Sequence, residues 1–120
     1  MVEISLDAIL LTTPDGLILT ANTKASEIFG YSEEEFVKLG RSGIVDNKDP
    51  KLPIILEEIR LKGEVKSELT FIRKNGEKLR AVISSRIFKD EKGNEMIIRI
   101  IRDMSDRLLA EENLKESEDH

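Results

Sequence analysis

The side chains with the most obvious potential for chemistry are carboxylates. They occur singly and in one run, at Asp7, Asp15, Asp46, Asp49 and Glu33–Glu35. General acid–base catalysis relies most often on histidine, but the single histidine, His120, is the last residue. Each carboxylate also has a structural explanation in a helix cap, a turn or a solvated face. We therefore expect no acid–base site.

Cofactor sites are also poorly supported by the sequence. The chain contains no cysteine, which excludes disulfides, thiolate metal sites, thiol nucleophiles and cysteine-linked chromophores. A haem needs an axial ligand, usually histidine, and only Met or Tyr could serve inside this chain. The segment Gly40-Arg41-Ser42-Gly43 is too short and too isolated for a phosphate-binding loop. We expect no metal and no cofactor, while a non-covalent flavin or an unknown small molecule stays compatible with the sequence.

Arg99 is the single residue with the sharpest alternative interpretations. It interrupts the apolar run from Met96 to Ile101, in the last predicted strand. We favour a position on the outer face of the sheet, with the aliphatic stem covering apolar surface and the guanidinium in water. The alternative points Arg99 into the interior, where it would bind a ligand carboxylate.

Composition limits the possible partners. With 120 residues the chain is long enough for one domain with one core. Its net charge is −5 and it has no basic patch, so we expect neither nucleic acid nor an anionic membrane as a partner. The sequence shows no signal peptide and no apolar run near the ~20 residues that span a bilayer. We expect a cytoplasmic location without direct membrane contact.

Three turn signals divide much of the chain into five predicted strands. Asp15-Gly16, Asn75-Gly76 and Lys92-Gly93-Asn94 are typical of turns that close β-hairpins. The predicted strands beside them are apolar and partly β-branched, and they are Ala8–Thr13, Leu17–Ala21, Val65–Arg73, Leu79–Phe88 and Glu95–Arg102. Neighbours should pair antiparallel within a first group of two and a second group of three.

Helical signals occupy the stretch between the two groups of strands. Asn22 or Thr23 can cap a short helix that stops at Gly30, and Ser32–Glu35 is a capping box that starts another. Asp49-Pro50 predicts a third helix, running from Pro50 to Lys62 with an apolar stripe and ending at Gly63. We expect a loop at Arg41–Lys48 and a further helix at Ser105–Ser117. This order indicates an α+β fold, an antiparallel sheet with helices on one face.

The element order resembles the PAS fold, and short motifs of that family recur along nearly the whole chain. They are Leu6–Ile9 with Pro14–Gly16, Ala21-Asn22 with Ala25, Gly30–Ser32 and Glu34-Glu35, then Arg73–Glu77, Asp90–Asn94 and Asp103–Arg107. The resemblance implies a five-stranded antiparallel sheet with helices on one face, followed by a C-terminal signalling helix. It implies a sensory domain over residues 1–104 and a linker or signalling helix over residues 105–120.

The resemblance also implies how a signal leaves the domain. In the family the segment that is here Asp103, Ser105 and Arg107 joins the last strand to the signalling helix and passes strain outward. The residues alone allow a helix N-cap by Asp103 or Ser105, and both roles can coexist. The tail Ala110–Glu118 is similar to a linker before another PAS repeat. We expect a parent such as a multi-PAS sensor histidine kinase, while the fragment itself carries no kinase motif and should not be an enzyme.

The expected function is therefore signal reception by a small apolar or amphipathic ligand, relayed to an output domain of the parent chain. Candidate pocket residues, chosen from periodicity and the family's geometry, are Leu19, Ile28, Phe36, Ile55, Leu56, Ile59, Leu69, Phe71, Ile83, Arg99 and Ile101. A thin apolar seam in the C-terminal helix predicts a homodimer. The first alternative is a ligand-free PAS domain that only dimerises and relays. The second, a small-molecule enzyme, would need convergent polar groups that the sequence barely supplies.

Overall fold

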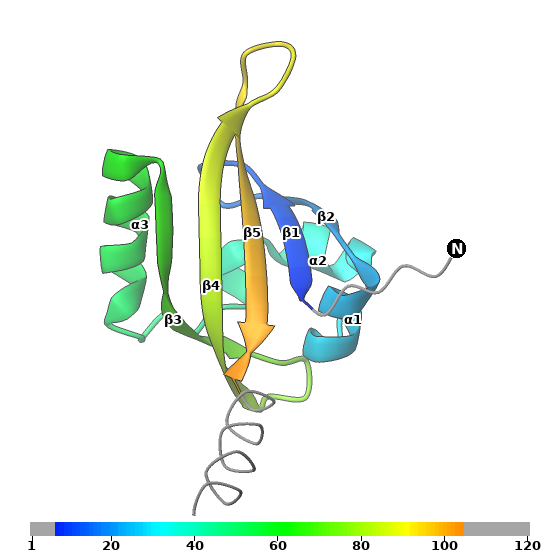
Figure 1. Cartoon of the computed structure of the whole chain (residues 1–120). Helices are drawn as coiled ribbons and strands as arrows, with labels where there is room; N and C mark the ends of the chain where they lie inside the picture. Colours follow the sequence, from blue (N-terminus) through cyan, green and yellow to red (C-terminus); the bar gives the residue numbers. More distant parts are fainter. Residues whose placement is uncertain (1–6, 105–120) are drawn as a thin grey trace, which may run out of the picture.

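A five-stranded antiparallel sheet forms the centre of the computed structural model, which describes residues 7–104 (Figure 1). The strands lie in the order β2-β1-β5-β4-β3. Their bounds are β1 (Ala8–Thr12), β2 (Ile18–Ala21), β3 (Glu64–Ile72), β4 (Lys78–Lys89) and β5 (Glu95–Asp103). All five predicted strands and the pairing within each group are confirmed.

The Asn75-Gly76 signal produces the predicted hairpin between β3 and β4. Gly76 has a φ of 89°, in the left-handed region that favours glycine. Its N–H donates to the carbonyl of Arg73 at 2.9 Å, and the N–H of Arg73 donates to the carbonyl of Glu77 at 2.8 Å. The turn therefore fixes the register that places Ile72 opposite Lys78.

The last strand occupies the middle of the sheet and joins the two groups of strands. β5 pairs with β4 on one side and with β1 on the other, where Ala8 lies opposite Ile101. Arg102, near the end of β5, donates through Nε and Nη2 to the carboxylate of Asp7 at 2.9 and 3.2 Å. The start of β1 and the end of β5 are therefore held side by side.

Two short helices follow the first hairpin, as predicted. They are α1 (Thr23–Phe29) and α2 (Glu33–Leu39). Asn22, rather than Thr23, is the N-cap of α1, because its Oδ1 accepts from the N–H of Ala25 at 2.9 Å. The same oxygen accepts from Ile9 in β1 at 3.0 Å, so the cap also fixes α1 against the sheet. The capping box at Ser32 and Glu35 is present.

The third helix, α3 (Lys51–Lys62), starts one residue later than predicted. Pro50 is its N-cap and makes no side-chain cap hydrogen bond, so the predicted N-cap at Asp49 is wrong. Asp49, one residue earlier, instead accepts from the N–H of Lys51 at 2.9 Å. The other carboxylate oxygen of Asp49 accepts from the N–H of Thr70 in β3, also at 2.9 Å. One carboxylate therefore fixes the start of α3 and its place beside β3.

The segment predicted as a loop at Arg41–Lys48 is more ordered than expected. It contains a 3₁₀ turn, η1 (Arg41–Gly43), and an isolated bridge between Val45 and Phe71 of β3. The N–H of Ile72 also donates to the carbonyl of Ile44 at 2.8 Å. Non-local backbone pairing of this kind leaves no periodic signal in the sequence, so the pattern alone could not reveal it.

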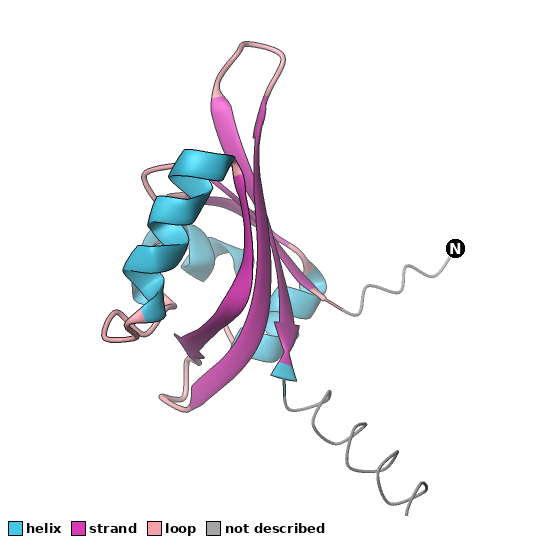
Figure 2. Cartoon of the chain, turned by 60° about the vertical axis from the view of Figure 1, so that its left-hand side comes forward, coloured by secondary structure: helices cyan, strands magenta, loops and turns pink. Residues whose placement is uncertain are grey.

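The helices cover one face of the sheet and enclose the core between them (Figure 2). Three edge-to-face ring contacts join Phe29 to Phe36, Phe29 to Phe71, and Tyr31 to Phe36, with centroids 5.4–5.6 Å apart.

Among residues 7–104, no helix combines the length and apolar character needed to cross a membrane. The predicted helix at Ser105–Ser117, including Ser105 and Arg107, and the terminal His120 lie outside the described residues.

Candidate functional site

A small cavity lies inside the core, between the sheet, α3 and the segment that follows α2. Its volume is about 10 Å³, which is close to the minimum that holds one water molecule. The walls are apolar apart from one threonine and two arginines, and they are formed by Leu10, Thr12, Ile18, Arg41, Ile44, Val45, Leu52, Ile55, Leu56, Leu69, Phe71, Ile83, Arg99 and Ile101. Residues from both ends of the sequence therefore meet at this cavity.

The structure brings together most of the residues expected to line a pocket, but not all of them. Those at the cavity are Ile55, Leu56, Leu69, Phe71, Ile83, Arg99 and Ile101. Phe36 and Ile59 are buried elsewhere in the core, and Ile28 packs against it while partly buried. These three residues support the core without lining the cavity.

Leu19 is the residue for which the expectation was wrong. Its side chain is 39% exposed, whereas the preceding Ile18 is buried and lines the cavity. Successive residues of a strand point to opposite faces. Both Ile18 and Leu19 are apolar, so the sequence could not decide which one would point inward.

Arg99 points into the interior, which corrects the favoured prediction of an outer-face position. It is 3% exposed and lines the cavity beside Ile101. The alternation of β5 places Ile97, Arg99 and Ile101 on the same face of the sheet. Because Ile101 was predicted to face the pocket, strand alternation also placed Arg99, two residues earlier, on the inner face. The prediction of an outer position rested instead on the cost of burying a charge.

Two hydroxyl groups hold the guanidinium of Arg99. Its Nε lies 3.1 Å from Oγ1 of Thr12 on β1, and its Nη1 lies 3.3 Å from Oγ of Ser85 on β4. Its Nη2 is buried and has no hydrogen-bond partner among residues 7–104. Burial, and then the positive charge of Arg41, lower the pKa of Arg99 to about 10, so it is still charged at neutral pH.

Arg41 is a second cation at the same cavity, and no pattern in the sequence indicates its role. Its backbone N–H donates to the carbonyl of Gly16 at 2.8 Å, and its guanidinium packs against Gly16. A Cβ at Gly16, where φ is 98°, would lie only 3.1 Å from Cζ of Arg41. Burial lowers the pKa of Arg41, although the charge of Asp15 opposes this shift. The Nη1 of Arg41 is buried and has no hydrogen-bond partner within the described part of the chain.

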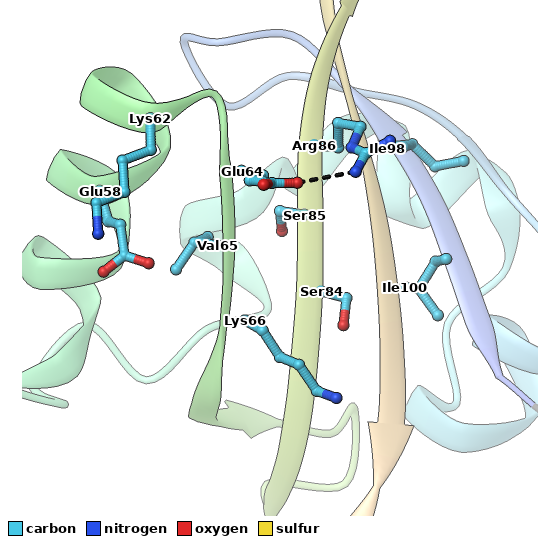
Figure 3. A pocket seen from close by; sticks show the side chains of 10 residues that line it. All are labelled: Glu58, Lys62, Glu64, Val65, Lys66, Ser84, Ser85, Arg86, Ile98 and Ile100. Carbon is cyan, nitrogen blue, oxygen red and sulfur yellow. Dashed lines mark hydrogen bonds and ion pairs between the residues drawn. The ribbon is translucent and has the colours of Figure 1, made fainter.

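A larger hollow of about 690 Å³ lies at the edge of α3 and along the outer face of the sheet (Figure 3). It is an open groove lined by residues such as Lys62, Lys66, Ile98 and Ile100. Glu64 and Arg86 form an ion pair of 2.9 Å across it, with both side chains well exposed. Exposed pairs of this kind contribute little binding energy, so the interior cavity is the better candidate for recognition.

Comparison with known proteins agrees with this architecture. A family model described as "PAS domain" matches residues 6–106. The chain belongs to the PAS domain family. This PAS domain is 29% identical over 116 residues to sporulation kinase E of Bacillus subtilis (strain 168), covering 97% of the chain but 15% of that kinase.

Solved structures show the same fold. A PAS domain from Colwellia psychrerythraea superposes with a TM-score of 0.73 at 20% identity, covering 82% of this chain and 86% of that one. A PAS domain from a two-component sensor histidine kinase gives a TM-score of 0.72 at 16% identity with the same coverage. These likenesses confirm the predicted fold class.

The end of β5 is connected to the β3–β4 hairpin of this PAS domain through Asp103. The Asp103 carboxylate lies 3.4 Å from Nη2 of Arg73, with 14% of the Asp103 side chain exposed. Asp103 also pairs with Ala81 of β4 at the end of the sheet. Of the three expected relay residues, only Asp103 is among the described residues, and it is the last residue of β5.

We expect Asp103→Ala to loosen this hairpin. The free energy of unfolding should fall by about 1 kcal/mol, because the partly exposed Arg73 loses a charged partner. Hydrogen exchange should become faster at the amides of Arg73–Glu77. Glu64→Ala, which breaks the more exposed pair with Arg86, serves as the control and should cost less. Unchanged exchange at the hairpin in Asp103→Ala would show that the contact between Arg73 and Asp103 does not couple β5 to the hairpin, and so has no part in relaying a signal.

Proposed function

We propose that this PAS domain is a sensory input module of a histidine-kinase-like signalling protein, and that its interior cavity binds a small apolar or amphipathic molecule. The relative sporulation kinase E and the PAS domain from a sensor histidine kinase support the setting. The observation that carries the binding role is an apolar interior cavity lined by a buried guanidinium whose Nη2 has no hydrogen-bond partner among residues 7–104. In folded proteins the large majority of buried donors have a hydrogen-bond partner, and a bound ligand would supply one here.

Binding in this cavity requires part of its wall to move. A volume of about 10 Å³ cannot hold an organic ligand. Leu52 and Leu56 on α3 line the cavity while only partly buried, so we propose that α3 is the wall that moves. Outward movement of α3 would change its contact with β3 through Asp49. We propose that this strain reaches β5 and, beyond Asp103, an output domain of the parent chain.

A ligand-free relay and dimerisation module is the second candidate. The observation that favours it is the small volume of the cavity, which is what a fully packed core would show. In this case the apolar residues only support the fold. Signals would then pass between domains through β5 and the segment after it, without a molecule inside.

Native mass spectrometry of the freshly purified 120-residue chain separates the two candidates. We expect a mass excess that disappears on denaturation, together with a homodimer. An empty dimer that stays empty after incubation with small aliphatic molecules would support the relay instead. An empty monomer would contradict both proposals, because neither binding nor association would then occur in this chain.

A further inference from the structure

We propose that the ligand of the cavity carries a carboxylate, held between Nη2 of Arg99 and Nη1 of Arg41, with a short aliphatic chain directed toward α3. The inference rests on the proposed function in one respect, namely that the cavity opens to take a ligand. It adds the chemical class of that ligand and assigns Arg41 a role in binding.

The charges around the cavity are unbalanced. Both guanidiniums line it, and each has a buried nitrogen without a hydrogen-bond partner among residues 7–104. Arg99 is 3% exposed, whereas Arg41 is partly buried. Asp15 attracts Arg41 from a distance and accepts a hydrogen bond from the hydroxyl of Thr13. Buried charges are normally paired, because leaving one unpaired in an apolar interior is costly. An anion would neutralise this excess, whereas a neutral ligand or water would satisfy donors without removing it.

The two donors are held in fixed positions, which favours a specific ligand. Thr12 and Ser85 bind Nε and Nη1 of Arg99, so the direction of its free Nη2 is set by two neighbouring strands. Gly16 holds Arg41 through a backbone hydrogen bond and through contact with its guanidinium. Donors that are already ordered lose little entropy on binding. Carboxylate oxygens suit guanidinium donors in charge and geometry.

The remaining walls specify the rest of the ligand. Apart from the two arginines and Thr12, all of the lining side chains are Leu, Ile, Val or Phe. A hydrocarbon chain suits these walls, and each buried methylene should strengthen binding about fourfold. Because the cavity is only about 10 Å³ in volume, a short chain costs less rearrangement of α3 than a long one. A short fatty acid or another small aliphatic carboxylate therefore fits best.

The test uses the whole chain in chloride-free buffer and isothermal titration calorimetry with acetate, butyrate and hexanoate as probes. Butyramide and hexanamide are the neutral matches. We expect affinity to rise along the acid series and to exceed that of the amides. Arg99→Met and Arg41→Met should each weaken hexanoate binding by about 10- to 100-fold, as expected for loss of a charged hydrogen bond. Arg86→Met, at an exposed ion pair of the same sheet, should leave binding unchanged.

The outcomes separate this inference from the proposed function. If hexanoate and hexanamide bind the wild type and Arg99→Met equally, the cavity binds ligands but the anion site is wrong. If no acid and no amide binds the wild type, the anion site is wrong, and an empty chain by native mass spectrometry would then overturn the sensor proposal as well. If Arg99→Met does not fold, Arg41→Met and Arg99→Lys test the anion site instead. Lysine keeps the positive charge but lacks the two-pronged donor geometry of the guanidinium, so hexanoate binding should still weaken.

Discussion

Ile55→Trp is expected to lower the free energy of unfolding by about 1–3 kcal/mol. Ile55 is 2% exposed and lines a cavity of about 10 Å³, so an indole ring has no space without displacing α3. Urea denaturation of both proteins, followed by circular dichroism, measures the change. Ile54→Trp is the matched control, because Ile54 is the preceding residue on α3 and is 64% exposed.

The same substitution should also abolish binding of any molecule that occupies the cavity. An unchanged denaturation midpoint would show that the interior opens at almost no cost, as in a pocket that expands easily. Destabilisation together with a wild-type protein that never binds a ligand would favour the relay. The two measurements therefore distinguish a sensor from a packed core whatever the chemical identity of the ligand.

Thr12→Val should cost about 1–3 kcal/mol of folding free energy. The change preserves shape but removes the hydroxyl that binds Nε of Arg99, leaving another donor of a buried cation without a partner. The hydroxyl also lies 3.4 Å from the carbonyl of Ile97, a weaker contact. Denaturation of the single variants and of the double variant with Arg99→Met gives the coupling between the two residues.

We expect Thr12→Val to cost far less once Arg99 has been replaced by methionine. The hydroxyl would then have no buried cation to bind and would keep only its weak contact with the carbonyl of Ile97, so replacing it by a methyl group should cost little. Equal costs in the two backgrounds would mean that Thr12 acts through Ile97 or through packing. The role of Thr12 in positioning Arg99 would then be wrong.

Most of the fold could be predicted because its signals are local. Turn dipeptides such as Asn75-Gly76, the capping box at Ser32 and the apolar stripe of α3 each act within a few residues of their own position. The bridge between Val45 and Phe71 and the central place of β5 depend on partners far along the chain. No local pattern encodes such contacts.

The candidate site was harder to predict than the fold. The apolar walls followed from periodicity, but Arg41 reaches the cavity through its contact with Gly16, which lies on another element. Arg99 shows a different difficulty, because two rules gave opposite predictions. The alternation of β5 predicts an inward side chain, whereas the cost of burying a charge predicts an outward one. Thr12 and Ser85 resolve that conflict by binding the guanidinium. Places where one rule yields to another in this way are often functional.

The pairing of β1 with β5 also determines how the domain responds to mechanical load. Asp7 and Arg102 bind each other where β1 begins and β5 ends, so the chain segments that precede Asp7 and follow Asp103 are attached at the same end of two adjacent inner strands. Tension between those attachments would peel the two antiparallel strands apart one hydrogen bond at a time, beginning with this ion pair, rather than shear them all together. Unzipping needs less force than shearing. Such tension would therefore open the sheet at Ala8 and Ile101 first, and from there toward Leu10 and Arg99 at the cavity.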